Sequence, residues 1–222
     1  VASSSTFGGA GSITVPAGQS LTLTSSTVNN TLAIAGTLIA RGGTTLNGAV
    51  TTAAGSLIRI QGDSAVGTGS LTVNQAWTNN GTVELTSVGG AHAAQLFGAT
   101  LTNAVGAALN ILVGAGGSRR IDAPIANQGT VTVSAAVDFF PGNGAVTNSG
   151  TWTVDANQTM TFSTNGSFTS SGTLTVNTGR TLSTNNGGFS WQGGTWNGGG
   201  TVSFTNVAVT FGANFTQAQQ VT

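Results

Sequence analysis

Five acidic side chains are the groups in this sequence best suited to acid–base chemistry or metal binding: Asp63, Glu84, Asp122, Asp138 and Asp155. Enzymes that cleave polysaccharides hold two or more carboxylates close together, as acid and base or as metal ligands. Asp138 lies nine residues after Gly129, whereas Asp155 lies five residues after Gly150, the matching glycine of the next repeat. The acids therefore do not line up in neighbouring repeats. We expect no catalytic residue, no metal site and no cofactor, and keep a polysaccharide-active enzyme as an alternative.

A second candidate for chemistry is the densest cluster of charge in the chain, Arg119, Arg120 and Asp122. It lies within the glycine-rich stretch Gly114–Pro124, which reads as a loop. Arginine beside aspartate is suited to contacting an anion or a glycan. The same pair is also what a solvated loop with a local ion pair looks like, and such a pair contributes little by itself. The sequence favours the ion pair and leaves a ligand contact open.

The aromatic residues offer a sugar-stacking surface, and here too a simpler reading competes. Trp191 and Trp196 could stack against sugar rings, but Trp196 occupies the repeat position held by Val131, an expected core residue. Buried aromatic packing is the commoner arrangement. The pair Phe139-Phe140 must direct one ring outward if it lies in a strand, so it is the better candidate for an exposed apolar contact.

Threonine pairs recur at alternate positions: Thr130 and Thr132, Thr151 and Thr153, Thr173 and Thr175. Stacked in register, they would form a flat array of hydroxyl and methyl groups like the ice-binding faces of some β-solenoids. Outward threonine is also what an exposed strand prefers. Ice binding is therefore a minor alternative, tested by thermal hysteresis.

The elements that position these side chains follow from a repeated phrase. It begins Gly129-Thr-Val-Thr-Val133, Gly150-Thr-Trp-Thr-Val154 and Gly172-Thr-Leu-Thr-Val176, with the glycines 21 and 22 residues apart. A fixed period of this size is typical of a solenoid. Alternation of apolar and hydroxyl residues indicates strands, and each period has three apolar segments separated by turn residues. We therefore predict an all-β, right-handed parallel β-helix with three short strands per coil of about 21 residues.

The same phrase is less regular before residue 90. Gly55, Gly69 and Gly81 open strand-like segments at spacings of 14 and 12 residues, so they mark successive strands as well as successive coils. We predict a single domain over residues 1–222, of roughly ten coils, as a segment or subunit of a larger surface assembly. Two stretches without alternation, Gly89–Phe97 and Gly114–Pro124, are expected to project as loops, and the first holds His92, the only histidine.

Asparagine recurs two residues before the glycine, as Asn79, Asn127 and Asn148, followed by Ser170 and Gln192. Amides stacked coil upon coil can bond to those above and below and to the backbone of the turns. We expect a ladder of these side chains along the solenoid. A second apolar pair, Met160 with Phe162 in one copy and Leu182 with Thr184 in the next, is expected to stack in the same way.

Composition excludes several classes of function. Five arginines balance five acids and there is no lysine, so the chain lacks the positive charge that binds nucleic acid or anionic membranes. No run approaches about 18 apolar residues, so we expect no transmembrane helix. Cysteine is absent from the 222 residues, which excludes disulfides and thiolate metal sites.

The phrase Asn-x-Gly-Thr-(Val/Trp/Leu)-Thr-Val resembles the repeats of large bacterial surface proteins, and the segment Gly188-Phe-Ser-Trp-Gln-Gly-Gly-Thr-Trp-Asn-Gly-Gly-Gly-Thr-Val-Ser-Phe204 resembles them most closely. These are the β-strand-repeat, filamentous-haemagglutinin-like and autotransporter-passenger proteins. The resemblance covers the C-terminal half well and is weak before Gly55. It implies export to the bacterial surface and a role in adhesion, biofilm matrix or fibre formation.

We therefore expect an extracellular structural protein, either an adhesin segment or a self-assembling fibre subunit, with a glycan-binding module as the alternative. Neither Val1–Gly11 nor Ala213–Thr222 offers a charged or helical cap for a solenoid end. Uncapped ends pair with further strands. The expected partners are thus another copy stacked head to tail or neighbouring repeats of the same parent chain, with a surface glycan as a further candidate.

Overall fold

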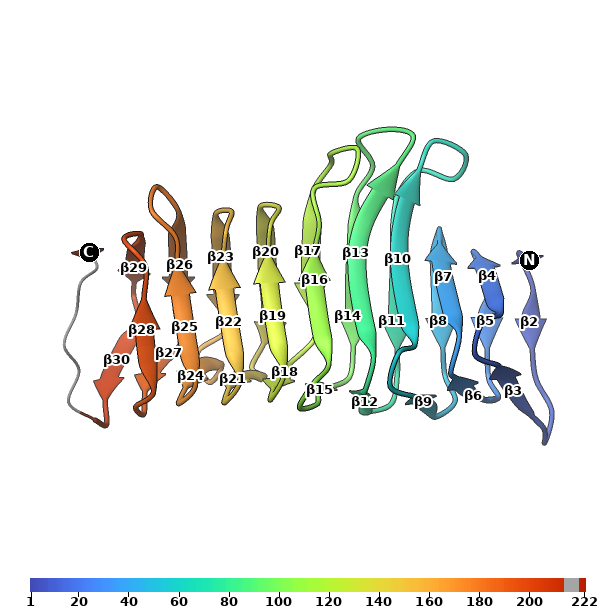
Figure 1. The fold of residues 1–222 in the computed structure, drawn as a ribbon, viewed down its shortest axis with the longest axis horizontal. Helices are drawn as coiled ribbons and strands as arrows, with labels where there is room; N and C mark the ends of the chain where they lie inside the picture. Colours follow the sequence, from blue (N-terminus) through green and yellow to red (C-terminus); the bar gives the residue numbers. More distant parts are fainter. Residues whose placement is uncertain (214–219) are drawn as a thin grey trace.

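The chain folds as a parallel β-solenoid. The computed structural model describes residues 1–213 and 220–222. The prediction that Ala213–Thr222 provides no cap concerns mainly residues 214–219, which lie outside the described part. Up to the strand Gly188–Trp191, each strand pairs in parallel with the strand three places further along the chain, so three strands make one coil. The all-β class, the three strands per coil and the total of about ten coils confirm the sequence prediction. Figure 1 shows the resulting rod, with Val1 at one end and the last strands at the other.

Sheet A has ten strands. They are β1 (Ala2–Ser3), β4 (Ser20–Thr24), β7 (Thr37–Arg41), β10 (Leu57–Asp63), β13 (Thr82–Val88), β16 (Ala108–Ile111), β19 (Thr130–Val133), β22 (Thr151–Val154), β25 (Thr173–Val176) and β28 (Thr195–Asn197). This sheet contains the repeated Gly-Thr-x-Thr-Val phrase.

Sheet B has eleven strands. They are β2 (Thr6–Phe7), β5 (Thr27–Val28), β8 (Gly43–Leu46), β11 (Gly69–Val73), β14 (Ala94–Gly98), β17 (Arg119–Asp122), β20 (Val137–Gly142), β23 (Gln158–Phe162), β26 (Thr181–Asn185), β29 (Thr201–Thr205) and β31 (Gln220–Val221). This sheet contains the whole charged cluster Arg119, Arg120 and Asp122, in β17.

Sheet C has ten strands and closes each coil. They are β3 (Ser12–Val15), β6 (Thr31–Ile34), β9 (Val50–Thr52), β12 (Trp77–Asn79), β15 (Leu101–Asn103), β18 (Ile125–Asn127), β21 (Ala145–Asn148), β24 (Ser167–Ser170), β27 (Gly188–Trp191) and β30 (Ala208–Phe211). Among the described residues, no helix has the length and apolar character needed to cross a membrane.

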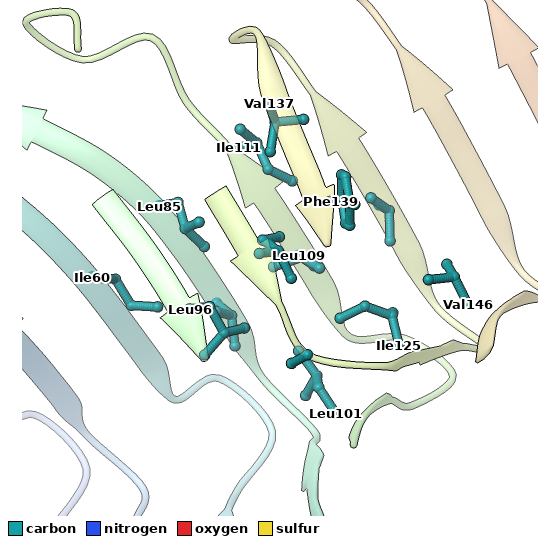
Figure 2. Packing of buried hydrophobic residues seen from close by; sticks show 14 of the residues in the cluster. Ile60, Leu85, Leu96, Leu101, Leu109, Ile111, Ile125, Val137, Phe139 and Val146 are labelled. Carbon is teal, nitrogen blue, oxygen red and sulfur yellow. The ribbon is translucent and has the colours of Figure 1, made fainter. Parts of the chain in front are cut away.

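The core is a narrow column of apolar side chains that all three sheets direct inward. In β19, Val131 and Val133 are fully buried, while Thr130 and Thr132 point outward. Figure 2 shows residues such as Leu85 and Leu109 of sheet A meeting residues of sheets B and C inside the coil. Burying an aliphatic side chain contributes about 1.5–3 kcal/mol, and every central coil buries several. The regular alternation predicted from the sequence is what fills this column.

Towards the C-terminus the core becomes aromatic. Phe139, Trp152, Phe168 and Phe189 lie in consecutive contact with ring centroids 5.6 Å apart. The indole Nε1 of Trp152 donates a 3.0 Å hydrogen bond to Oε1 of the buried Gln158. Aromatic pairs at such separations contribute beyond the area that they bury.

A ladder of buried amides runs through sheet C. Asn79, Asn103, Asn127 and Asn148 occupy equivalent positions, and each Nδ2 donates to the side-chain oxygen of the next residue: 2.8 Å for the three amide pairs and 3.0 Å from Asn148 to Ser170. The predicted ladder is confirmed up to Ser170. Asn103, which no glycine follows at the usual spacing, had been missed.

Gln192 was wrongly assigned to this ladder. Ser170 pairs with Trp191 in the next coil, so the indole occupies the ladder position and Gln192 lies exposed at the corner. The predicted stacking of Met160 over Leu182 is also wrong, because Met160 pairs with Thr184, and Gln158 pairs with Leu182. From Val154 to Gln158 the chain is two residues shorter than from Val176 to Leu182, the equivalent stretch of the next coil. This difference shifts the register of the strands that follow.

Coil length varies more than the repeat suggested. Asn29 and Asn47 occupy equivalent positions in successive coils and are 18 residues apart, whereas the equivalent residues Arg59 and Glu84 are 25 residues apart. The extra residues form three corners between sheets A and B that project from one edge of the rod (Figure 1). Two of them overlap the predicted loops, but Ala94–Gly98 and Arg119–Asp122 are strands rather than loop. The third, after β10, had not been predicted.

Candidate functional site

Arg119 begins β17 with its side chain directed into the solenoid, where it is only 1% exposed. Its guanidinium donates to a ring of backbone carbonyls around the preceding corner, including those of Leu112 at 3.0 Å and Val113 at 2.8 Å. It also donates to the hydroxyl of Ser87 at 3.2 Å. Burial lowers the pKa of Arg119. This residue fixes the corner 112–118 from within and is not available as the surface contact that the sequence had suggested.

Arg120 points to the other side, onto the outer face of sheet B. Its Nε and Nη2 donate to the two carboxylate oxygens of Asp122 at 2.8 and 2.6 Å, in a two-bond pair. Its guanidinium carbon lies 4.6 Å from the centroid of the Phe140 ring. These hydrogen bonds to Asp122, with the nearby charges of Asp122 and Asp138, raise the pKa of Arg120. Arg120 is thus held between an ion pair and an aromatic ring.

Neighbouring strands add further side chains to this surface. In register, Gln95 of β14 and Asp138 of β20 lie on either side of Arg120, and Phe97 of β14 lies beside Asp122. Phe97 and Phe140 are each half-buried, and Asp138 is exposed. We call Gln95, Phe97, Arg120, Asp122, Asp138 and Phe140 the Arg120 face.

A hollow of about 340 Å³ adjoins this face at the start of β20 and β23. Asp138 and Thr159 line it from the strands, Asn157 from a corner, and Gly117 and Ser118 from the corner that Arg119 fixes. Its volume lies at the small end of the range for ligand pockets. The Arg120 face and this hollow together place aromatic, charged and amide side chains beside a concave surface.

The tryptophans proposed as a sugar platform are in the core. Trp191 is 1% exposed and Trp196 is 9% exposed, and their ring centroids are 5.2 Å apart. Trp196 also packs against Phe189 at 5.9 Å. The core interpretation of Trp196 is the one that the structure supports, and neither ring offers a face to a ligand.

The threonines lie outward in register, as expected. Thr130, Thr151 and Thr173 form one column of sheet A, and the shared register extends it to Thr195. Thr132, Thr153 and Thr175 form the parallel column. Towards the N-terminus the first column continues with Ala108 and the second with Asn110. The array is therefore a patch over four coils.

Two of the three remaining acids form ion pairs with arginines of sheet A, and the third, Asp155, accepts a hydrogen bond from the side-chain amide of Asn177. Glu84 accepts from Arg59 at 2.9 Å, and Asp63 pairs with Arg41. The hydrogen bond from Arg41 lowers the pKa of Asp63 to about 2, and the carboxylate also accepts from the backbone of the following turn, at Ala65. Within the described part of the chain, no three His, Cys, Asp or Glu side chains gather as metal ligands.

Sequence reasoning found Arg120 and Asp122, and its expectation that one ring of Phe139-Phe140 points outward is confirmed by the buried Phe139 and the outward Phe140. It missed three members of the Arg120 face. Asp138 seemed isolated because the coil between it and Arg120 is short, so the constant period of 21 residues did not align them. Gln95 and Phe97 were assigned to a loop. Their alternation with the buried Ala94 and Leu96 was the available signal.

Comparisons with protein families, with curated proteins and with solved structures find no match to this chain.

Proposed function

We propose that this chain is a non-catalytic structural segment of a secreted or cell-surface bacterial protein, and that its function is to provide a stiff, elongated rod. Three parallel sheets of ten, eleven and ten strands, continuous from coil to coil, are the observation that carries this proposal. The resemblance of the repeats to β-strand-repeat and filamentous-haemagglutinin-like surface proteins supports the extracellular location. The two versions of the function are an adhesin segment and a subunit of a fibre or biofilm matrix.

The size of the rod follows from its sheets. Neighbouring strands in a sheet are about 4.8 Å apart, so ten coils span about 50 Å along the axis. Stacked strands and the buried amide ladder resist bending because every inner coil is bonded to both of its neighbours. Such a rod is suited to holding other domains at a fixed separation.

The first coil has strand edges that can pair with a further coil. β1, β2 and β3 each pair on one side only, with β4, β5 and β6. An unpaired strand edge accepts another strand. In the fibre version a second copy supplies it, in a head-to-tail contact that does not close on itself. In the adhesin version an adjoining stretch of a longer parent chain supplies it.

Electron microscopy and light scattering of the concentrated, purified chain separate the two versions. The fibre version predicts filaments that lengthen in steps of about 50 Å per subunit. Thr14→Lys places a charge on the outward side of the edge strand β3 and should abolish them, whereas Thr102→Lys, also outward but on the central strand β15, should not. Monomers alone at high concentration would exclude the fibre version and leave the adhesin segment.

Two activity tests bear on the alternatives. Release of unsaturated sugars from a uronate polymer would overturn the non-catalytic proposal. Thermal hysteresis at millimolar protein would support ice binding by the threonine patch. We expect neither, because the acids form ion pairs or lie apart and the patch spans only four coils.

A further inference from the structure

The outer surface of sheet B changes character at the Arg120 face. On most of its other described strands, the outward positions carry threonine, serine or glycine, as at Ser70 and Thr72 of β11. Over β14, β17 and β20 they carry an amide, two aromatic rings, an arginine and two carboxylates. A rod that needed only a soluble surface would not require this change.

We propose that the Arg120 face binds a neutral, hydroxyl-rich glycan that lies across β14, β17 and β20. Aromatic rings present a negative face to which the C–H groups of a sugar ring are attracted. Phe97 supplies such a ring, and Phe140 supplies the ring face that the Arg120 guanidinium does not cover. Both residues stand on strands rather than on loops. Stacking of Arg120 on Phe140 fixes the guanidinium and the ring in place, so that little conformational entropy is lost on binding.

The polar groups of the face match sugar hydroxyls. No hydrogen bond or ion pair within the described chain engages the exposed carboxylate of Asp138, and a carboxylate accepts from hydroxyl groups without a competing donor of its own. Gln95 offers both an acceptor and donors. Asp138 also lines the hollow of about 340 Å³, so one sugar unit can sit in the hollow while its neighbours lie on the strands.

The charges select against acidic glycans. Asp122 already balances Arg120 through two hydrogen bonds. Asp138 leaves one negative charge in excess on the face, so a uronate or sialate would be repelled, whereas a neutral sugar would not. The buried Arg119 is a positioning residue in this scheme, because it fixes the corner that walls the hollow.

Isothermal titration of the full chain tests the proposal with maltohexaose, cellohexaose, mannohexaose and chitopentaose as neutral probes and hexagalacturonate as the acidic one. We expect at least one neutral probe to bind with a Kd of about 1 mM or tighter, and hexagalacturonate not to bind. Asp138→Ala and Phe140→Ala should each weaken that binding by about tenfold or more. Ser183→Ala on β26 and Arg59→Ala on sheet A should leave it unchanged, and circular dichroism should confirm that all variants fold.

Four outcomes would overturn the inference, three from the titrations and one from a chelator. Those from the titrations are no saturable binding of any neutral probe, wild-type affinity in both Asp138→Ala and Phe140→Ala, and preference for hexagalacturonate. Binding that disappears when divalent cations are chelated would assign the carboxylates to a metal instead, and would also overturn it. These results are separable from the rod proposal, since the Arg120 face lies in central coils and filament formation depends on the ends.

Discussion

Replacing Asn127 with alanine removes the centre of the buried amide ladder. Its Nδ2 donates to Asn148 at 2.8 Å and to the carbonyl oxygen of Thr151 at 3.0 Å, and its Oδ1 accepts from Asn103 at 2.8 Å. Alanine leaves the buried Oδ1 of Asn148 without this donor and opens a small cavity. An orphaned buried polar group costs about 1–3 kcal/mol and the cavity adds to it, so we expect a loss of about 3–5 kcal/mol.

Two control variants test whether the stability lost in Asn127→Ala comes from its missing hydrogen bonds. Gln128→Ala, on the exposed neighbour, should change stability by less than about 0.5 kcal/mol. Asn127→Ser should cost less than alanine, because Ser170 already fills the equivalent position one coil after Asn148 and accepts from it at 3.0 Å.

Urea unfolding measures the free-energy change, and amide hydrogen exchange locates it. Because each coil contacts only its neighbours, lost protection should be concentrated in β15, β18 and β21. A loss in Asn127→Ala no larger than in Gln128→Ala would refute the reasoning, since the ladder would then contribute nothing that solvent could not replace.

Three further predictions follow from burial and charge. Val176→Asp should unfold its region, because it buries an unpaired charge, whereas the outward Thr175→Asp should be mild; equal losses in urea would contradict the assigned strand faces. Arg119→Met should cost at least about 2 kcal/mol and raise hydrogen exchange at residues 112–118, and unchanged exchange there would contradict its role. The lowered pKa of Asp63, about 2, stabilises the fold fully above about pH 4. That contribution, up to about 2 kcal/mol, should fade as pH falls towards 2. A wild-type minus Asp63→Asn difference in unfolding free energy that is flat with pH would be the contrary result.

The solenoid itself could be predicted because its core depends on a local pattern. Val131, Trp152 and Leu174 stand at the same place in successive copies, and their alternation with threonine specifies which face is inward. Asn127 and Asn148 were recognisable for the same reason. Period and alternation are properties that a single sequence displays directly.

What could not be predicted depends on how many residues each corner contains. The shift that pairs Gln158 with Leu182, and the one that puts Trp191 rather than Gln192 after Ser170, each come from small differences in corner length. The Arg120 face was hidden for the same reason, since Arg120 and Asp138 become neighbours across a coil that is shorter than the 21- or 22-residue repeat. Arg119 and Arg120 are adjacent residues of the same type. Because side chains alternate between the two faces of a strand, Arg119 is buried and holds the corner, whereas Arg120 lies on the surface.

The unequal coils have a mechanical consequence. A coil advances the rod by one strand spacing, about 4.8 Å, whether its repeat contains 18 or 25 residues. The length of the rod therefore depends on the number of coils and does not change when residues are added at the corners. Selection can lengthen a projecting corner, such as the one that Arg119 fixes, and so alter what the surface contacts without changing the distance at which the rod presents it.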